Sequence, residues 1–246
     1  MESKELFSIL DSVDSTNNYA MARVHEGLAS HGQAWFSAMQ TAGKGQREKK
    51  WYSRPGENIA LSIAMQPGSV FQGKQFLFNA FIACECFHFL KKYAGEYTRI
   101  KWPNDLYWRD RKAGGILIEN NMLGSQWNWA VVGIGLNINQ ENFPPDLPNP
   151  VSMKQITGKS ENILSMAKLL HSHILSTFAK LSPSNLASLI SDYNRFLYKK
   201  NEEVKLRKNR TVFTTTVKSV NEFGQLLTQD AIERRFDFGE VEWVVS

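Results

Sequence analysis

The chain has 246 residues, of which 42% are hydrophobic and 22% are charged. This length predicts one large domain, or one domain with a small appendage, and the apolar fraction excludes a disordered or fibrous protein. The net charge of +5 is too small to indicate a nucleic-acid-binding protein, although it suits anionic ligands.

Cysteine usage and hydropathy set the expected compartment. Cys84 and Cys86 lie two residues apart in an apolar run, so they cannot make a disulfide framework and are expected to be core residues. We expect no signal peptide and no membrane-spanning segment, because the most apolar stretch, residues 76–90, is short and contains polar residues. The sequence therefore predicts a cytoplasmic protein without membrane association.

The first half of the chain predicts a helix, two strands around a glycine-rich basic loop, and a long buried helix. The first helix can be capped by Asp14 or Ser15 and ends at Gly27. The long helix shows apolar side chains at a period near 3.6 and ends near Gly95. The expected ranges are 17–26 for the first helix, 34–40 and 58–65 for the strands, 41–57 for the loop and 74–93 for the long helix.

From Ile100 the pattern changes to short strands with tight turns, which predicts an antiparallel meander. A proline-rich surface loop, two amphipathic helices and a small β-barrel-like appendage follow. The expected meander strands are 106–108, 115–119, 127–133 and 136–139, with turns at Asp110, Asn120–Asn121, Gly124 and Gly135. The helices begin at Ile163 and Leu186, and the appendage strands are 203–207, 211–220, 225–228, 234–238 and 241–245.

The basic loop from Gln40 to Trp51 is a candidate anion-binding site. Glycines such as Gly43 let backbone N–H groups approach an anion, and Lys44 and Arg47 supply positive charge. A charge pair contributes only about 1 kcal/mol in water, so the loop must exclude water to bind strongly, and Trp51 can form that cover. The loop lacks the Lys-Ser/Thr pair of a Walker A motif, and a solvated basic turn is the alternative interpretation.

Two later segments carry further polar side chains. Pro103 fixes the chain before Asn104 and Asp105, whose side-chain oxygens suit Mg²⁺ with its bound phosphates. Lys112 follows a tight turn, so a rigid hairpin can aim its side chain inward; an exposed lysine on an ordinary hairpin is the alternative. A glycine-rich strand beyond it carries Asn137 as another polar ligand, although a bent core strand would show the same pattern.

These segments, with Asp14-Ser-Thr-Asn at the first helix, match one family in order and spacing. The blocks Lys101-Trp-Pro-Asn-Asp and Lys112-Ala-Gly-Gly-Ile-Leu and the ending Phe238-Gly-Glu-Val-Glu-Trp-Val resemble biotin protein ligases, the biotin–[acetyl-CoA-carboxylase] ligases, in a short form without an N-terminal DNA-binding domain. The resemblance implies an α+β fold related to class II aminoacyl-tRNA synthetases. A mixed, largely antiparallel sheet flanked by helices would occupy residues 1–198, and an SH3-like β domain residues 199–246.

The resemblance also implies a two-step reaction. Biotin's carboxylate attacks the α-phosphate of ATP to give biotinyl-5′-AMP and pyrophosphate, and a lysine of a biotin carboxyl carrier protein then displaces AMP. Biotin and ATP would be substrates, Mg²⁺ the metal and the carrier domain the partner, with no sequence-specific DNA binding and a monomeric or homodimeric state. The alternatives are a lipoate or octanoate ligase of the same superfamily and a non-catalytic biotin or adenylate sensor.

Most site residues follow from the same resemblance, and Asp105 is added on chemical grounds. Lys112 and Asp105 are expected to be catalytic: the lysine neutralises the reacting carboxylate and α-phosphate, and Asp105 orients or deprotonates the acceptor amine. Gln46 and Glu48 replace an arginine and a glycine of many relatives, and we hypothesise a more mobile loop that holds the adenylate less tightly. The biotin-binding positions are Ser15, Thr16, Gln40, Gly43, Lys44, Lys112 and Gly115. The adenylate-binding positions are Lys44, Arg47, Trp51, Asn104, Lys112 and Asn137, with Asn104 and Asn137 also assigned to Mg²⁺.

Overall fold

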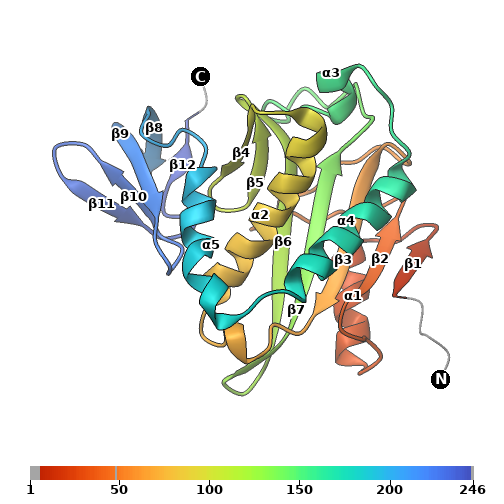
Figure 1. The fold of residues 1–246 in the computed structure, drawn as a ribbon. Coiled ribbons are helices and arrows are strands. Elements are labelled where there is room, and N and C mark those ends of the chain that lie inside the picture. The colour runs from red at the N-terminus through yellow and green to blue at the C-terminus, as the bar shows by residue number, and fades with distance from the viewer. Residues whose placement is uncertain (1–5, 48, 245–246) are drawn as a thin grey trace.

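The structure is a computed structural model that describes residues 6–47 and 49–244. Within these residues the main sheet has seven strands in the order β1-β2-β3-β7-β6-β5-β4 (Figure 1). Strands β1 and β2 pair in parallel, and the other neighbours pair antiparallel. The strands are β1 (Phe7–Leu10), β2 (Gln33–Ser37), β3 (Asn58–Met65), β4 (Thr98–Lys101), β5 (Asp105–Trp108), β6 (Arg111–Leu123) and β7 (Gln126–Asn137).

Helices cover both faces of the main sheet. Helices α2 (Gln75–Ala94), α4 (Ile163–Phe178) and α5 (Pro183–Arg195) pack together on one face, and α1 (Thr16–His25) packs on the other (Figure 1). A 3-10 turn, η1 (Ser69–Phe71), and the short α3 (Met153–Thr157) lie in connections. Among the described residues, no helix is both long and apolar enough to span a membrane.

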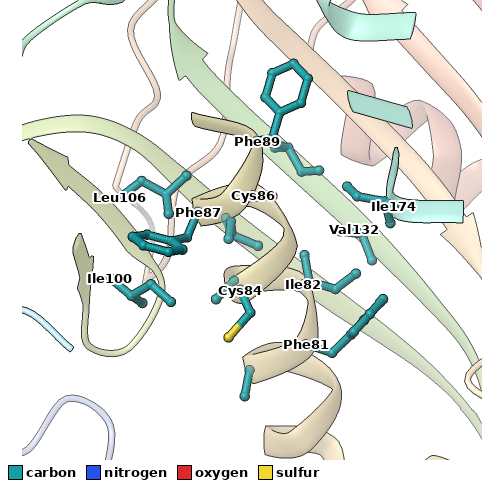
Figure 2. Packing of buried hydrophobic residues seen from close by; sticks show 14 of the residues in the cluster. Phe81, Ile82, Cys84, Cys86, Phe87, Phe89, Ile100, Leu106, Val132 and Ile174 are labelled. Carbon is teal, nitrogen blue, oxygen red and sulfur yellow. The ribbon is translucent and has the colours of Figure 1, made fainter. Parts of the chain in front are cut away.

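Helix α2 is the centre of the larger core. Its apolar side chains pack in one cluster with Ile100 of β4, Leu106 of β5 and Ile174 of α4 (Figure 2). Cys84 and Cys86 on this helix are buried and free, as the sequence predicted. Burial raises the pKa of both thiols, so neither is a reactive thiolate at neutral pH.

The described part of the C-terminal segment forms a second sheet, the C-terminal sheet, in the order β11-β10-β9-β8-β12, which is compatible with an SH3-like domain. Leu206, Val217 and Leu226 of this sheet belong to the same apolar cluster as α2. The two sheets therefore share a continuous core. The strands of the C-terminal sheet are β8 (Glu203–Lys208), β9 (Thr211–Val220), β10 (Leu226–Gln229), β11 (Glu233–Phe236) and β12 (Glu242–Trp243).

The structure confirms the antiparallel meander but corrects two of its turns. The turn expected at Asn120–Asn121 is wrong, because β6 continues to Leu123 with a register shift after Asn121. The turn expected at Gly135 is also wrong, because β7 runs through this position as one strand. The strand expected over 34–40 ends at Ser37, and β1 and α3 were not predicted.

Candidate active site

A cavity of about 700 Å³ opens on the α1 side of the main sheet. Its walls come from the start of α1, the loop between β2 and β3, strands β4–β7 and residues 238–243 of the C-terminal segment. The cavity brings together every predicted site residue except Gly43, which lines an adjoining cavity of about 450 Å³ beneath the loop. Four separate segments of the sequence therefore converge on one pocket.

A polar network forms the α1 wall of this pocket. The backbone N–H of Thr16 donates to Gln40 Oε1 at 2.8 Å, and the Thr16 hydroxyl donates to the same oxygen at 3.1 Å. The Ser62 hydroxyl donates to Asn17 Oδ1 at 2.6 Å, and Asn17 Nδ2 donates to Glu119 Oε2 at 2.8 Å. These bonds hold buried polar groups in fixed orientations, which suits recognition of a small polar ligand.

Sequence reasoning assigned Ser15, Thr16 and Gln40 to this wall but missed Asn17 and Ser62. Ser15 is the N-cap residue of α1 and is buried. Ser62 could have been found as the lone hydroxyl within the otherwise apolar run of β3, since a buried hydroxyl needs a partner. Asn17 stands in the motif that carried the family resemblance.

Glycines let the basic loop approach the sheet closely. A Cβ on Gly43 would lie 2.5 Å from the Trp51 carbonyl oxygen, and a Cβ on Gly135 would lie 2.5 Å from Trp51 Cε2. The Trp51 indole therefore rests directly on the backbone of β7. Its N–H is buried and has no hydrogen-bond partner in the described part of the chain. Lys44 is more exposed and pairs with Glu119 at 3.5 Å.

Arg47 joins the basic loop to the C-terminal segment. Its guanidinium donates to the carbonyl oxygens of Gly239 at 2.9 Å and Phe238 at 3.2 Å, and it lies 4.9 Å from the centroid of the Phe238 ring. The Arg47 backbone has a φ of 52°, in the left-handed region. The contact with the C-terminal segment was not predicted, and Glu48 lies outside the described residues.

Lys112 and Asp105 face each other on neighbouring strands. Lys112 Nζ lies 2.6 Å from Asp105 Oδ1, and the two side chains are 30% and 22% exposed. A Cβ on Gly115 would lie 3.4 Å from Asp105 Oδ1 and 3.5 Å from Lys112 Nζ, so this glycine sits beside the pair. The ion pair fixes an ammonium group in the pocket wall, as the hairpin pattern predicted.

Two buried asparagines, Asn104 and Asn137, line the same pocket. Asn104 Nδ2 donates to the Ile116 carbonyl, and Asn137 Nδ2 donates to the carbonyls of Val151 at 3.1 Å and Lys112 at 3.2 Å. Each amide nitrogen thus donates to a backbone carbonyl, and the side-chain oxygen is the atom of each asparagine able to ligate a cation. The described residues contain no cluster of three or more His, Cys, Asp or Glu that could hold a metal ion.

Solved structures of biotin protein ligases have the same fold. The Aquifex aeolicus enzyme in complex with biotin and ATP matches with a TM-score of 0.81 and 24% identity, over 98% of this chain and 99% of that one. The Leishmania major enzyme in complex with biotinyl-5-AMP matches with a TM-score of 0.65 and 21% identity, over 98% of each chain. These likenesses define the class of fold.

Residues 9–137 match the biotin/lipoate A/B protein ligase family, and the chain belongs to that family. The bifunctional ligase/repressor BirA of Escherichia coli is 27% identical over 95% of this chain and 73% of its own length. The biotin–[acetyl-CoA-carboxylase] ligase of Paracoccus denitrificans is 34% identical over 61% of this chain and 63% of its own length. Against the Salmonella typhimurium BirA, at 32% identity, the chain spans 51% of the relative's length.

Proposed function

We propose that this protein is an ATP-dependent biotin protein ligase. It converts biotin and ATP to biotinyl-5′-AMP and pyrophosphate, then transfers biotin to a lysine of the biotin carboxyl carrier protein of a biotin-dependent carboxylase. The observation that carries the proposal is the Lys112–Asp105 pair at 2.6 Å in a pocket shared with the α1 network and the basic loop, in a member of this ligase family.

In the first step, an oxygen of the biotin carboxylate bonds to the α-phosphorus while the bond from this phosphorus to pyrophosphate breaks. Both reactants are anions, so the main requirement is neutralisation of charge and alignment. Lys112 supplies an ammonium group at the reacting atoms, and Lys44 adds positive charge from the loop. Trp51 excludes water above β7, which strengthens these interactions.

In the proposed function, separate sets of residues bind biotin and the adenylate. Biotin lies against Ser15, Thr16 and Gln40 and beside Gly115, with Gly43 and Lys44 of the loop closing over it. The adenylate lies under Trp51, with Arg47 as the loop's further cation. Support for this arrangement comes from the shared cavity and from the polar network that orients the α1 wall.

In the second step, the carrier's lysine must lose a proton before its nitrogen attacks the acyl carbon and AMP leaves. Asp105 carries a carboxylate that already accepts from Lys112. We assign it to orienting the acceptor amine and accepting its proton, because its remaining oxygen can face the incoming lysine.

The two asparagine side-chain oxygens suit Mg²⁺ if the phosphates of ATP supply its other ligands. The side-chain oxygens of Asn104 and Asn137 would hold the ion, since their amide nitrogens are occupied by backbone carbonyls. Mg²⁺ prefers oxygen ligands and usually binds through one or two protein groups plus phosphates and water. When bound, it neutralises phosphate charge.

The proposed setting is cytoplasmic, where buried free thiols such as Cys84 and Cys86 stay reduced. The carrier protein is the proposed macromolecular partner, for a monomeric or homodimeric ligase.

The test is pyrophosphate release from Mg-ATP with either biotin or lipoate as the second substrate. We expect release with biotin and none with lipoate. Release with lipoate alone would move the protein to the sister activity. Measurable biotin binding without release would instead support the sensor, a class in which the Lys112 ammonium would have no reaction to serve.

A further inference from the structure

Lys101 is a buried cation that pairs with no carboxylate in the described part of the chain. It is the last residue of β4, is 9% exposed, and lines the proposed active-site cavity. Its ammonium donates to the Tyr107 hydroxyl at 3.1 Å. Among residues 6–47 and 49–244, no carboxylate lies within 4.0 Å of it. An ammonium has three donors, so this side chain has unused hydrogen-bonding capacity facing a cavity.

Aromatic rings from both sheets enclose this ammonium. Its Nζ lies 4.7 Å from the centroid of the Tyr107 ring and 5.3 Å from that of Trp243. Trp243 belongs to β12 of the C-terminal sheet, so the enclosure spans the two sheets. The Trp243 indole N–H is itself buried and has no acceptor among the described residues. Among the described residues, the Trp243 N–H thus has no acceptor, and the neighbouring Lys101 ammonium has the Tyr107 hydroxyl but further N–H donors to spare.

The charges around Lys101 favour an anionic ligand. Asp105, the acid whose charge Lys101 feels, is already paired with Lys112 at 2.6 Å. Lys112 and Lys49 both add positive potential at the Lys101 ammonium. Burial, as the largest cause, lowers the pKa of Lys101 to about 8. An anion in this corner would offset both the burial and the repulsion.

We propose that Lys101, enclosed by Tyr107 and Trp243, binds the β- and γ-phosphates of ATP and the pyrophosphate that leaves. This inference rests on the proposed ligase function. A diphosphate suits the corner better than a carboxylate, because Lys101 and Lys49 still offer two positive charges when the Lys112–Asp105 pair is counted as neutral. When the bond to the α-phosphorus breaks, its electron pair goes to the leaving oxygen, and Lys101 stabilises that charge without proton transfer.

The C-terminal sheet therefore completes the nucleotide site. Without the ring of Trp243 the Lys101 ammonium would be open to water, and its attraction for phosphate would weaken. Trp243 acts through Lys101 and is a positioning residue, whereas Lys101 contacts the phosphates directly.

The decisive measurement is calorimetric titration of the full chain with magnesium pyrophosphate, which needs no turnover. We expect the Lys101→Met variant to bind pyrophosphate about tenfold or more weakly than the wild type. Its KM for ATP should rise by a similar factor, while its KM for biotin stays within about twofold. Lys168→Met is the matched control, because Lys168 also lies over a ring, that of Phe7, but on α4 away from the pocket.

Two further variants test the aromatic rings around Lys101 separately from the charge of its ammonium. Trp243→Leu should weaken pyrophosphate binding by about threefold to tenfold, and Tyr107→Phe, which keeps the ring, by less. Unchanged pyrophosphate affinity in folded Lys101→Met would overturn the proposal, as would a fall in kcat with an unaltered KM for ATP. Failure of the proposed ligase function would give a different result, because the wild type itself would then release no pyrophosphate with biotin.

Discussion

The two faces of the main sheet are built from the same strands but carry different side chains. On the face under α2 and α4, β3 presents large aliphatic residues that belong to the larger core. On the α1 face, the alternate residues of β3 are small, and β7 places glycines there. The helix-facing residues are Ile59, Leu61 and Ile63, and the α1-facing residues are Ala60, Ser62, Ala64, Gly133 and Gly135.

This difference shows how one sheet serves stability and binding at once. Successive side chains of a strand point to opposite faces, so a strand can fill a core on one side and leave space on the other. The space on the α1 face admits Asn17 against Gly133 and Trp51 against Gly135. Substitutions on the two faces should therefore affect different measurements.

The largest expected effect on stability is on the helix-covered face. Ile63→Ala removes a fully buried side chain from the core and should lower the free energy of unfolding by about 2–5 kcal/mol. Denaturant unfolding measures this change. The KM values for ATP and biotin, taken well below the melting temperature, should stay at the wild-type level. A large rise in either KM would contradict the separation of the two faces.

The largest expected effect on catalysis is on the pocket face. Lys112→Ala removes the ammonium from the reacting atoms and should reduce the rate of biotinyl-AMP formation by about a hundredfold or more. Single-turnover pyrophosphate release measures the rate. Stability should change little, because the Lys112–Asp105 pair is partly exposed. A near-wild-type rate would remove Lys112 from the proposed mechanism.

Adding one methyl group to the pocket face should affect both measurements. In Gly135→Ala the new Cβ would meet the Trp51 indole at 2.5 Å, so the loop must shift, at a cost of about 1–3 kcal/mol. Retention of biotinyl-AMP should weaken as Trp51 is displaced. Gly115→Ala is the folding control, because its Cβ would meet neighbours only at 3.4 Å or beyond. Equal melting temperatures for both variants would contradict the tight Trp51 contact.

Lys101 places a charge on the pocket face at the expense of stability. The unfolded chain holds this proton up to its ordinary pKa of 10.5, whereas burial lowers the folded pKa to about 8. Between these values the unfolded state binds more protons, so wild-type stability rises with pH. Lys101→Met should therefore be more stable than the wild type by about 3 kcal/mol at neutral pH. Thermal melts should show this advantage shrinking as pH rises from about 8 to 10.5.

The smallest expected effect concerns the loop itself. Gln46 lines the pocket as an uncharged residue of the basic loop. Gln46→Arg adds one charge near the adenylate, and about 1 kcal/mol of attraction should slow biotinyl-AMP dissociation about fivefold. A stopped-flow or filter-binding off-rate measures the effect. An unchanged off-rate would rule out the hypothesis that this loop holds the adenylate less tightly.

The fold was predictable where burial is uniform. β3 is buried along its whole length, and its predicted range, 58–65, matches the observed one. The glycines of β7 misled the prediction, because glycine is common both in turns and where another group contacts a strand backbone. The short edge strand β1 was missed because four residues show too little periodicity.

The candidate site was predictable where sequence neighbours stay together in space. The hairpin that places Lys112 beside Asp105 is local, and its pattern indicated an inward lysine. Contacts between distant segments were not predictable. The bonds from Arg47 to Phe238 and Gly239, and the ring of Trp243 over Lys101, depend on how the C-terminal sheet packs on the main sheet.

The order of the pocket residues along the chain has a consequence for biosynthesis. The pocket is lined from Ser15 near the beginning of the described chain to Trp243 near its end. A ribosome makes the α1 wall first and the ring over Lys101 last. A nascent chain therefore lacks the last wall of this pocket until residue 243 has left the exit tunnel, and the Lys101 ammonium is enclosed only after the C-terminal sheet has folded against its neighbour.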